Sequence, residues 1–117
     1  MFNYCCQYCA QYCKNFFGTV GEGTYIEIIN KTHLPIYFIV QYTLDVRTFT
    51  KKTSVFGYGK SGKIQFSQGS KNVCFNVLDN STTPPKLITN VTLPVTKRSC
   101  YNLMPTSGRP QLVEFSC

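Results

Sequence analysis

Hydrophobic and polar residues alternate with a period of two along much of the chain beyond residue 24. The clearest runs are YIEIIN over residues 25–30 and IYFIVQYTL over residues 36–44. Successive side chains of a β-strand point to opposite faces of the sheet, so such alternation is typical of strands with one buried face. Shorter runs of the same character follow at VRTFT, TSVFGYG, KIQFS, NVCFNVL, LITNVTL, CYNL and QLVEFSC.

These runs predict seven or eight short strands separated by turns that carry Gly, Pro and Asn. Such a series is typical of a sandwich or barrel. We therefore expect residues 25–117 to form an all-β domain, an antiparallel β-sandwich or jelly roll. We also expect KIQFS (63–67) and NVCFNVL (72–78) to form a hairpin-like pair, because a short turn-like segment joins them.

The first 17 residues, MFNYCCQYCAQYCKNFF, follow another pattern. On a helical wheel the cysteines and phenylalanines share one face, opposite Asn, Gln and Lys. The four-residue repeat is also a multiple of two, so an extended strand fits the same sequence. Length favours the helix, whereas the propensities of Tyr, Phe and Cys favour the strand. We predict an amphipathic N-terminal arm over residues 1–17, followed by a Gly-rich hinge over residues 18–24.

The arm carries four cysteines within nine residues. They can cross-link or dock the arm on a neighbouring subunit, carry acyl chains at a membrane, pack against the sandwich, or bind a metal. We favour the docking arm and expect no metal or other cofactor. The cross-linking or acylation residues are Cys5, Cys6, Cys9 and Cys13, and the docking or lipid-facing residues are Phe2, Phe16 and Phe17.

The other three cysteines lie in the predicted β domain. Cys100 and Cys117 flank the last predicted hairpin, and a turn centred on Gly108-Arg109 places them directly opposite each other. We therefore predict a cross-strand disulfide between them. Cys74 is out of phase with the apolar residues around it, so we expect it on the opposite face as a buried free thiol. Seven cysteines are an odd number, so at least one is free or bonds another molecule.

The net charge of +7 favours acidic partners. No acid occurs between Asp45 and Asp79, where aromatic residues interleave with cations. This composition suits an anionic membrane surface or nucleic acid, although a solvated face above buried aromatics is the simpler explanation. Because no nucleic-acid motif is present, we place the membrane ahead of nucleic acid. The predicted anionic-partner patch consists of Arg47, Lys51, Lys52, Lys60, Lys63 and Lys71.

Signatures of catalysis are lacking in the sequence. The single histidine, His33, lies in a predicted turn, and the five acids form no obvious pair. The segment GYGKSGK departs from the order of a phosphate-binding loop. We predict a protein that is not an enzyme and takes no small-molecule substrate. Three N-x-S/T triplets, at Asn30, Asn80 and Asn90, matter only for an exported chain.

No run approaches the roughly 20 apolar residues of a membrane-spanning helix, and the first residues lack the pattern of a signal peptide. The plan of a Cys-Cys arm, a hinge and a β-sandwich resembles that of disulfide-linked bacterial spore-appendage subunits. This resemblance is one of organisation and implies self-assembly.

We therefore predict a structural protein that forms homo-oligomers, such as a filament or surface layer, at the cell surface or outside the cell. One alternative is a membrane-associated or membrane-active module, peripheral to a membrane inside the cell. A second alternative is a small Ig-like binding protein that targets a host.

Overall fold

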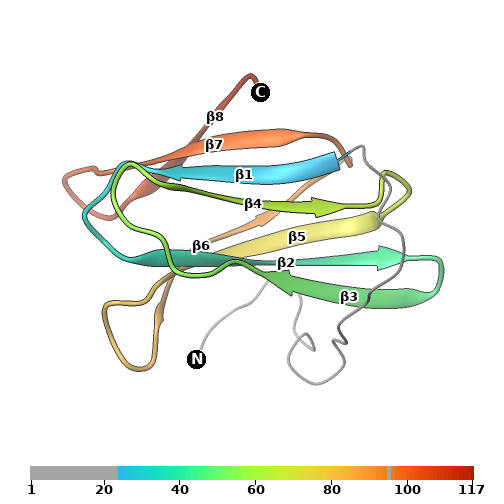
Figure 1. The fold of residues 1–117 in the computed structure, drawn as a ribbon, viewed down its shortest axis with the longest axis horizontal. Helices are drawn as coiled ribbons and strands as arrows, with labels where there is room; N and C mark the ends of the chain where they lie inside the picture. Colours follow the sequence, from blue (N-terminus) through green and yellow to red (C-terminus); the bar gives the residue numbers. More distant parts are fainter. Residues whose placement is uncertain (1–23, 95) are drawn as a thin grey trace.

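The computed structural model describes residues 24–94 and 96–117, so the predicted arm and most of the hinge lie outside the described residues. The described residues form eight strands in two four-stranded sheets and contain no helix (Figure 1). The prediction of an all-β sandwich is confirmed. None of the described residues belongs to a helix that could cross a membrane.

The two sheets share the strands equally. The first has the order β4-β1-β7-β8, with bounds Ser61–Phe66, Thr24–Asn30, Ser99–Met104 and Gln111–Phe115. The second has the order β3-β2-β5-β6, with bounds Arg47–Lys52, Ile36–Leu44, Lys71–Asp79 and Lys86–Thr92. All neighbouring strands are antiparallel except β1 and β7, which are parallel.

The predicted hairpin between β4 and β5 is wrong. β4 pairs with β1 and β5 pairs with β2, so the segment between them crosses from one sheet to the other. This crossing lets Phe66 and Val73, on opposite sides of the segment, enter the same core from two layers. The predicted pairing of the last two strands is confirmed by β7 and β8.

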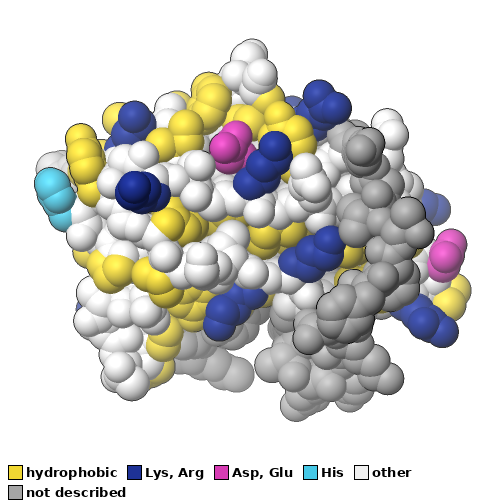
Figure 2. All heavy atoms as spheres, in the orientation of Figure 1, with side chains coloured by type: hydrophobic (Ala, Val, Ile, Leu, Met, Phe, Trp, Pro, Cys, Tyr) yellow, Lys and Arg dark blue, Asp and Glu magenta, His cyan; other side chains and the backbone are white. Residues whose placement is uncertain are grey.

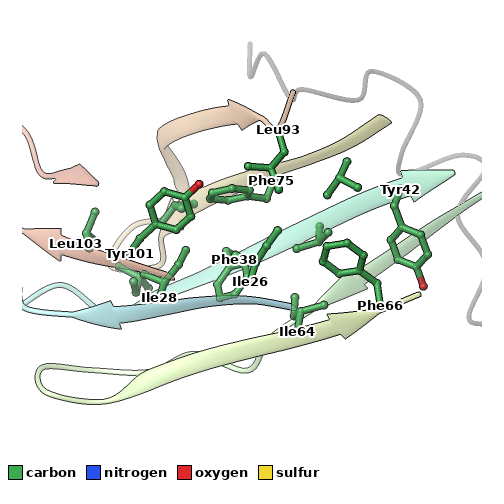
Figure 3. Packing of buried hydrophobic residues seen from close by; sticks show 14 of the residues in the cluster. Ile26, Ile28, Phe38, Tyr42, Ile64, Phe66, Phe75, Leu93, Tyr101 and Leu103 are labelled. Carbon is green, nitrogen blue, oxygen red and sulfur yellow. The ribbon is translucent and has the colours of Figure 1, made fainter. Parts of the chain in front are cut away.

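Apolar side chains from the inner faces of both sheets form the core (Figure 3). Phe75 of β5 links the layers, since its ring centroid lies 5.4 Å from that of Tyr101 on β7. Tyr42 of β2 stacks on Phe66 of β4 at 5.4 Å. Other members of the cluster include Ile26, Ile28, Phe38, Val40, Ile64, Val73, Val77 and Leu103.

A fully buried asparagine organises one end of the sandwich. Asn30 Oδ1 accepts hydrogen bonds from the backbone N–H of Thr32 at 2.9 Å and from its hydroxyl at 2.7 Å. Its Nδ2 donates to the carbonyl oxygens of Leu34 at 2.7 Å and Phe56 at 3.2 Å. The amide therefore fixes the β1–β2 connection against the β3–β4 connection. Its burial also removes Asn30 as a modification site in the folded protein.

Candidate functional site

The six cations of the predicted patch do not lie together. Arg47 pairs with Leu44 and Lys71 pairs with Thr43, which places both at the end where β2 finishes. Lys60 lies at the opposite end, where its carbonyl oxygen accepts a hydrogen bond from the last residue of β1 at 2.9 Å. Figure 2 accordingly shows Lys and Arg side chains spread over the visible face among hydrophobic ones.

Lys51 is the cation that bridges the two sheets. Its Nζ donates a hydrogen bond to the carbonyl oxygen of Gln65 on β4 at 2.7 Å. It also lies 5.9 Å from the centroid of the Tyr42 ring. Burial lowers the pKa of Lys51 and raises that of Tyr42, because both charged forms lose water there. The edge strands β3 and β4 therefore lie side by side along one side of the sandwich.

Tyr25, on the outer face of β1, carries two cations on its ring. The Nζ of Lys63 lies 4.1 Å from the ring centroid, and the guanidinium carbon of Arg98 lies 5.6 Å from it. Tyr25 is also in register with Gln65, the residue that Lys51 contacts. Tyr25, Lys63 and Arg98 thus form one cluster on the outer face of this sheet, which we call the tyrosine–cation surface.

Sequence reasoning missed Arg98. It lies outside the acid-free stretch that drew attention to the other cations, and it reaches Tyr25 because β7 runs parallel beside β1. The sequence gives no local signal of that long-range pairing. Lys52 forms a similar contact on the other sheet, where its Nζ lies 5.0 Å from the ring centroid of Tyr37.

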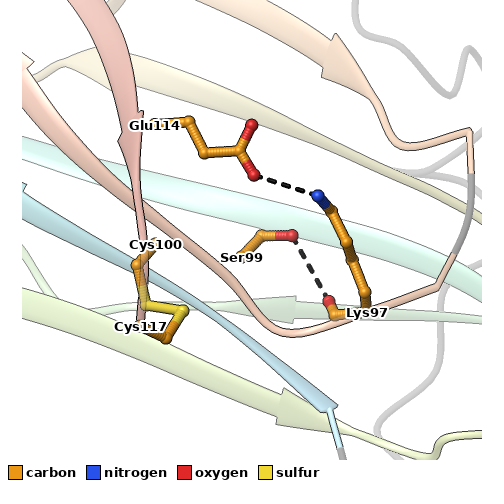
Figure 4. Close-up of polar contacts among 5 residues, drawn as sticks. All are labelled: Lys97, Ser99, Cys100, Glu114 and Cys117. Carbon is orange, nitrogen blue, oxygen red and sulfur yellow. Dashed lines mark hydrogen bonds and ion pairs between the residues drawn. A yellow bond between two sulfur atoms is a disulfide. The ribbon is translucent and has the colours of Figure 1, made fainter.

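A shallow hollow lies beside the tyrosine–cation surface. It encloses about 500 Å³ and is lined by Lys97, Arg98, Glu114, Phe115, Ser116 and Cys117. Lys97 Nζ and Glu114 Oε2 form an exposed ion pair at 3.1 Å across it (Figure 4). Because this pair is exposed, it adds little stability. Burial and the Glu114 carboxylate raise the pKa of Tyr101.

Cys100 and Cys117 form a disulfide bond next to this hollow, with their Cα atoms 5.4 Å apart (Figure 4). The predicted register is wrong, because Cys100 lies opposite Phe115 and not opposite Cys117. Cys117 follows the end of β8, and the chain there brings its sulfur back to Cys100.

Cys74 lies opposite Gln41 on the outer face of its sheet and is buried. The expectation of a free thiol is wrong, because Cys74 is disulfide-bonded. Cys5, Cys6, Cys9 and Cys13, together with Phe2, Phe16 and Phe17, lie outside the described residues. Over the described ranges, no three His, Cys, Asp or Glu side chains gather as metal ligands would.

No protein-family model matches the chain, and no curated protein matches it. Solved structures of toxins share the fold. A non-hemolytic pneumolysin from Streptococcus pneumoniae matches 80% of this chain and 23% of its own, with a TM-score of 0.57 and 11% identity. A disulfide-locked mutant of intermedilysin with human CD59 matches 79% of this chain and 24% of its own, with a TM-score of 0.54 and 17% identity.

Listeriolysin O matches 79% of this chain and 22% of its own, with a TM-score of 0.55 and 10% identity. The chain spans about a quarter of the length of each toxin structure. At these identities the likeness establishes a shared β fold.

Proposed function

We propose that the protein is a non-enzymatic β-sandwich module that binds an anionic membrane surface through its tyrosine–cation surface. The observation that carries this proposal is Tyr25 with Lys63 and Arg98 on its ring, at 4.1 Å and 5.6 Å from the centroid. The three side chains come from β1, β4 and the residue before β7, so three neighbouring strands of one sheet position them.

Tyrosine suits the boundary between water and lipid, because its ring is apolar and its hydroxyl is polar. The ammonium group of Lys63 and the guanidinium group of Arg98 lie over the ring as cation–π contacts, which hold positive charge at the face where lipid phosphates or carboxylates would bind. Each Lys or Arg near an anionic bilayer contributes about 1 kcal/mol of attraction. Two cations on one half-buried tyrosine therefore give a small attraction to the bilayer that salt weakens.

The charge of the described residues supports an anionic partner. Eleven of the twelve cations and four of the five acids lie within them, so they carry the full net charge of +7. Glu27 is the acid nearest to Tyr25 along β1 and stands in register with Lys63. Lys52 and Lys60 are also exposed, but they lie apart from this surface, Lys52 on the other sheet and Lys60 in the loop before β4.

The fold likeness supports the same class of function. The matched structures include pneumolysin, described as a sugar-binding protein, and a prepore complex of intermedilysin with CD59. These descriptions apply to those toxins, and they favour the membrane-associated alternative over the filament. Self-assembly through the arm remains a prediction, because the arm lies outside the described residues.

Co-sedimentation with vesicles tests the proposal. We expect the full chain to pellet with phosphatidylserine-containing vesicles and not with pure phosphatidylcholine vesicles, and to dissociate as salt is raised. The double variant Lys63→Gln with Arg98→Gln should bind about 30-fold more weakly, from roughly 2 kcal/mol of lost attraction.

The matched control is Lys86→Gln with Arg109→Gln, which removes the same charge from the start of β6 and from the β7–β8 connection. It should keep most of the affinity. Equal losses in the two double variants would show that net charge acts without a defined surface, and equal binding to neutral vesicles would remove the electrostatic role altogether.

A further inference from the structure

The outer face of the β3-β2-β5-β6 sheet is buried along β5. The outward side chains Cys74, Asn76 and Leu78 expose only 3%, 3% and 1% of their surface. Cys74 stands opposite Gln41 and Leu78 opposite Tyr37, on the side away from the other sheet. Cys74 and Leu78 accordingly lie outside the hydrophobic cluster between the sheets. Both faces of β5 are therefore covered.

The other sheet shows what an uncovered face looks like. β1 is also flanked on both sides, by β4 and β7, yet its outward residues Tyr25, Glu27 and Ile29 are only half-buried. A strand with one solvated face has this alternating burial. The described strands form two layers, so none of them covers the outer face of β5. A segment outside the eight strands must therefore cover it.

The disulfide of Cys74 points to the segment concerned. Cys100 and Cys117 are bonded to each other, so neither is the partner of Cys74. Within one chain the partner must then be one of the four cysteines of the arm, which are Cys5, Cys6, Cys9 and Cys13.

We propose that the arm, residues 1–17, folds back over the outer face of the β3-β2-β5-β6 sheet and that one arm cysteine is bonded to Cys74. The chain is long enough, because even Cys13 precedes Thr24 by eleven residues. Eleven extended residues span about 36 Å, compared with roughly 10 Å between stacked sheets. β1 and β5 also begin at the same end of the sandwich (Figure 1).

The bond forms by thiol–disulfide exchange with a small disulfide oxidant such as oxidised glutathione. One cysteine thiolate attacks the S–S bond of the oxidant and releases one glutathione thiolate. The second cysteine thiolate then attacks the mixed disulfide. This step forms the protein disulfide and releases the second glutathione thiolate. The chain gives up two protons and two electrons, and one oxidant molecule becomes two thiols.

Tryptic mapping of the non-reduced monomer tests this inference directly. Trypsin yields peptide 1–14 with all four arm cysteines, peptide 72–86 with Cys74, and peptide 99–117 with the other two, since Pro110 protects the bond after Arg109. We expect to find peptides 1–14 and 72–86 joined by a disulfide bond, and we expect a reductant to separate them. Peptide 72–86 as a free thiol, or linked to peptide 99–117, would overturn the proposal.

Isotope mixing separates folding back from exchange between chains. When ¹⁵N-labelled and unlabelled chains are refolded and oxidised together, the linked peptides should be wholly labelled or wholly unlabelled. Mixed labels would mean that the arm lies on a neighbouring copy.

Changing the four arm cysteines to Ser together should leave Cys74 as a thiol that maleimide labels once the non-reduced protein is unfolded, whereas the wild-type Cys74 should not be labelled. The control Cys100→Ser with Cys117→Ser should keep the link between peptides 1–14 and 72–86. A Cys74 that stays disulfide-bonded in the four-Ser variant would contradict the fold-back. Vesicle binding tests the proposed function separately from this inference, because Tyr25, Lys63 and Arg98 belong to the other sheet. A failed disulfide mapping would therefore leave the membrane proposal standing, and a failed vesicle assay would leave the fold-back standing.

Discussion

At the scale of single residues, Asn30 shows how one buried amide determines the position of two connections. Both of its donors and both accepting positions of its oxygen are used, so no isosteric replacement keeps all four bonds. In Asn30→Asp an oxygen would face the carbonyl oxygens of Leu34 and Phe56. We expect a loss of about 3 kcal/mol in the free energy of unfolding, measured with urea.

The matched control is Asn80→Asp in the exposed loop after β5. It should stay within about 0.5 kcal/mol of the wild type. A stable Asn30→Asp variant would show that the hydrogen-bond cluster at Asn30 does not hold the two connections.

Tyr101 gives the fold a dependence on alkaline pH. Its raised pKa, caused by burial first and by Glu114 second, means that the folded protein keeps a proton that the unfolded chain loses near pH 10. Unfolding then releases protons, so the free energy of unfolding is unaffected below that pH and falls as the pH rises above it. Urea unfolding from pH 9 to 11 should show a shallower fall for Tyr101→Phe. If the free energy of unfolding falls equally steeply with pH in the wild type and in Tyr101→Phe, Tyr101 does not cause the dependence.

At the scale of strands, the sequence predicted the elements well but only one of the two strand pairs, that of β7 with β8. The predicted run over residues 36–44 coincides with β2. A half-buried strand has apolar residues at every second position, and this alternation is visible in the sequence. The pairing of β4 with β1 and the parallel pairing of β1 with β7 join distant segments. The local sequence gives no signal of such long-range contacts. For this reason the predicted β4–β5 hairpin was wrong, and Arg98 was not included in the predicted patch.

The disulfide near the C-terminus illustrates the same limit. The flanking positions of Cys100 and Cys117 pointed to a bond, but the register of β7 and β8 differs by two residues from the one assumed. The turn geometry between Met104 and Gln111 sets that register, and its residues allow more than one turn.

The charged surface was only partly predictable for a related reason, since its cations come from separate strands.

Gly62 tests how β4 packs against the connection that precedes it. A Cβ there would lie 2.6 Å from Cε1 of Phe56 and 3.2 Å from Cε1 of Phe38. Gly62→Ala should therefore lose about 1–3 kcal/mol through overpacking, seen as a lower midpoint in thermal unfolding. Gly57→Ala, with open space around the added carbon, is the control and should change little. Equal midpoints would mean that Phe56 moves aside freely.

At the scale of the whole molecule, the odd number of cysteines limits how the chain can oxidise. Cys100 is bonded to Cys117, and the fold-back proposal pairs Cys74 with one arm cysteine, which leaves three arm cysteines, so at least one would have no partner within the chain. We expect the oxidised protein to form disulfide-linked oligomers above the 13.3 kDa monomer on a non-reducing gel.

Reduction should return these oligomers to the monomer, and Ser in place of Cys5, Cys6, Cys9 and Cys13 should abolish them. The Cys100→Ser, Cys117→Ser double variant is the comparison, because it leaves all four arm thiols in place. If the wild-type protein stays monomeric without reductant, the prediction that the arm cross-links subunits is wrong.

The most direct test of the membrane proposal locates the bound face. With lipid nanodiscs that contain phosphatidylserine and a nitroxide-labelled lipid, paramagnetic broadening of amide NMR signals reports which residues lie near the bilayer. The proposal predicts strong broadening around Tyr25, Lys63 and Arg98, and little around Lys86 and Asn90 on the other sheet. Broadening centred on β6, or none at any residue, would contradict a membrane-binding role for the tyrosine–cation surface.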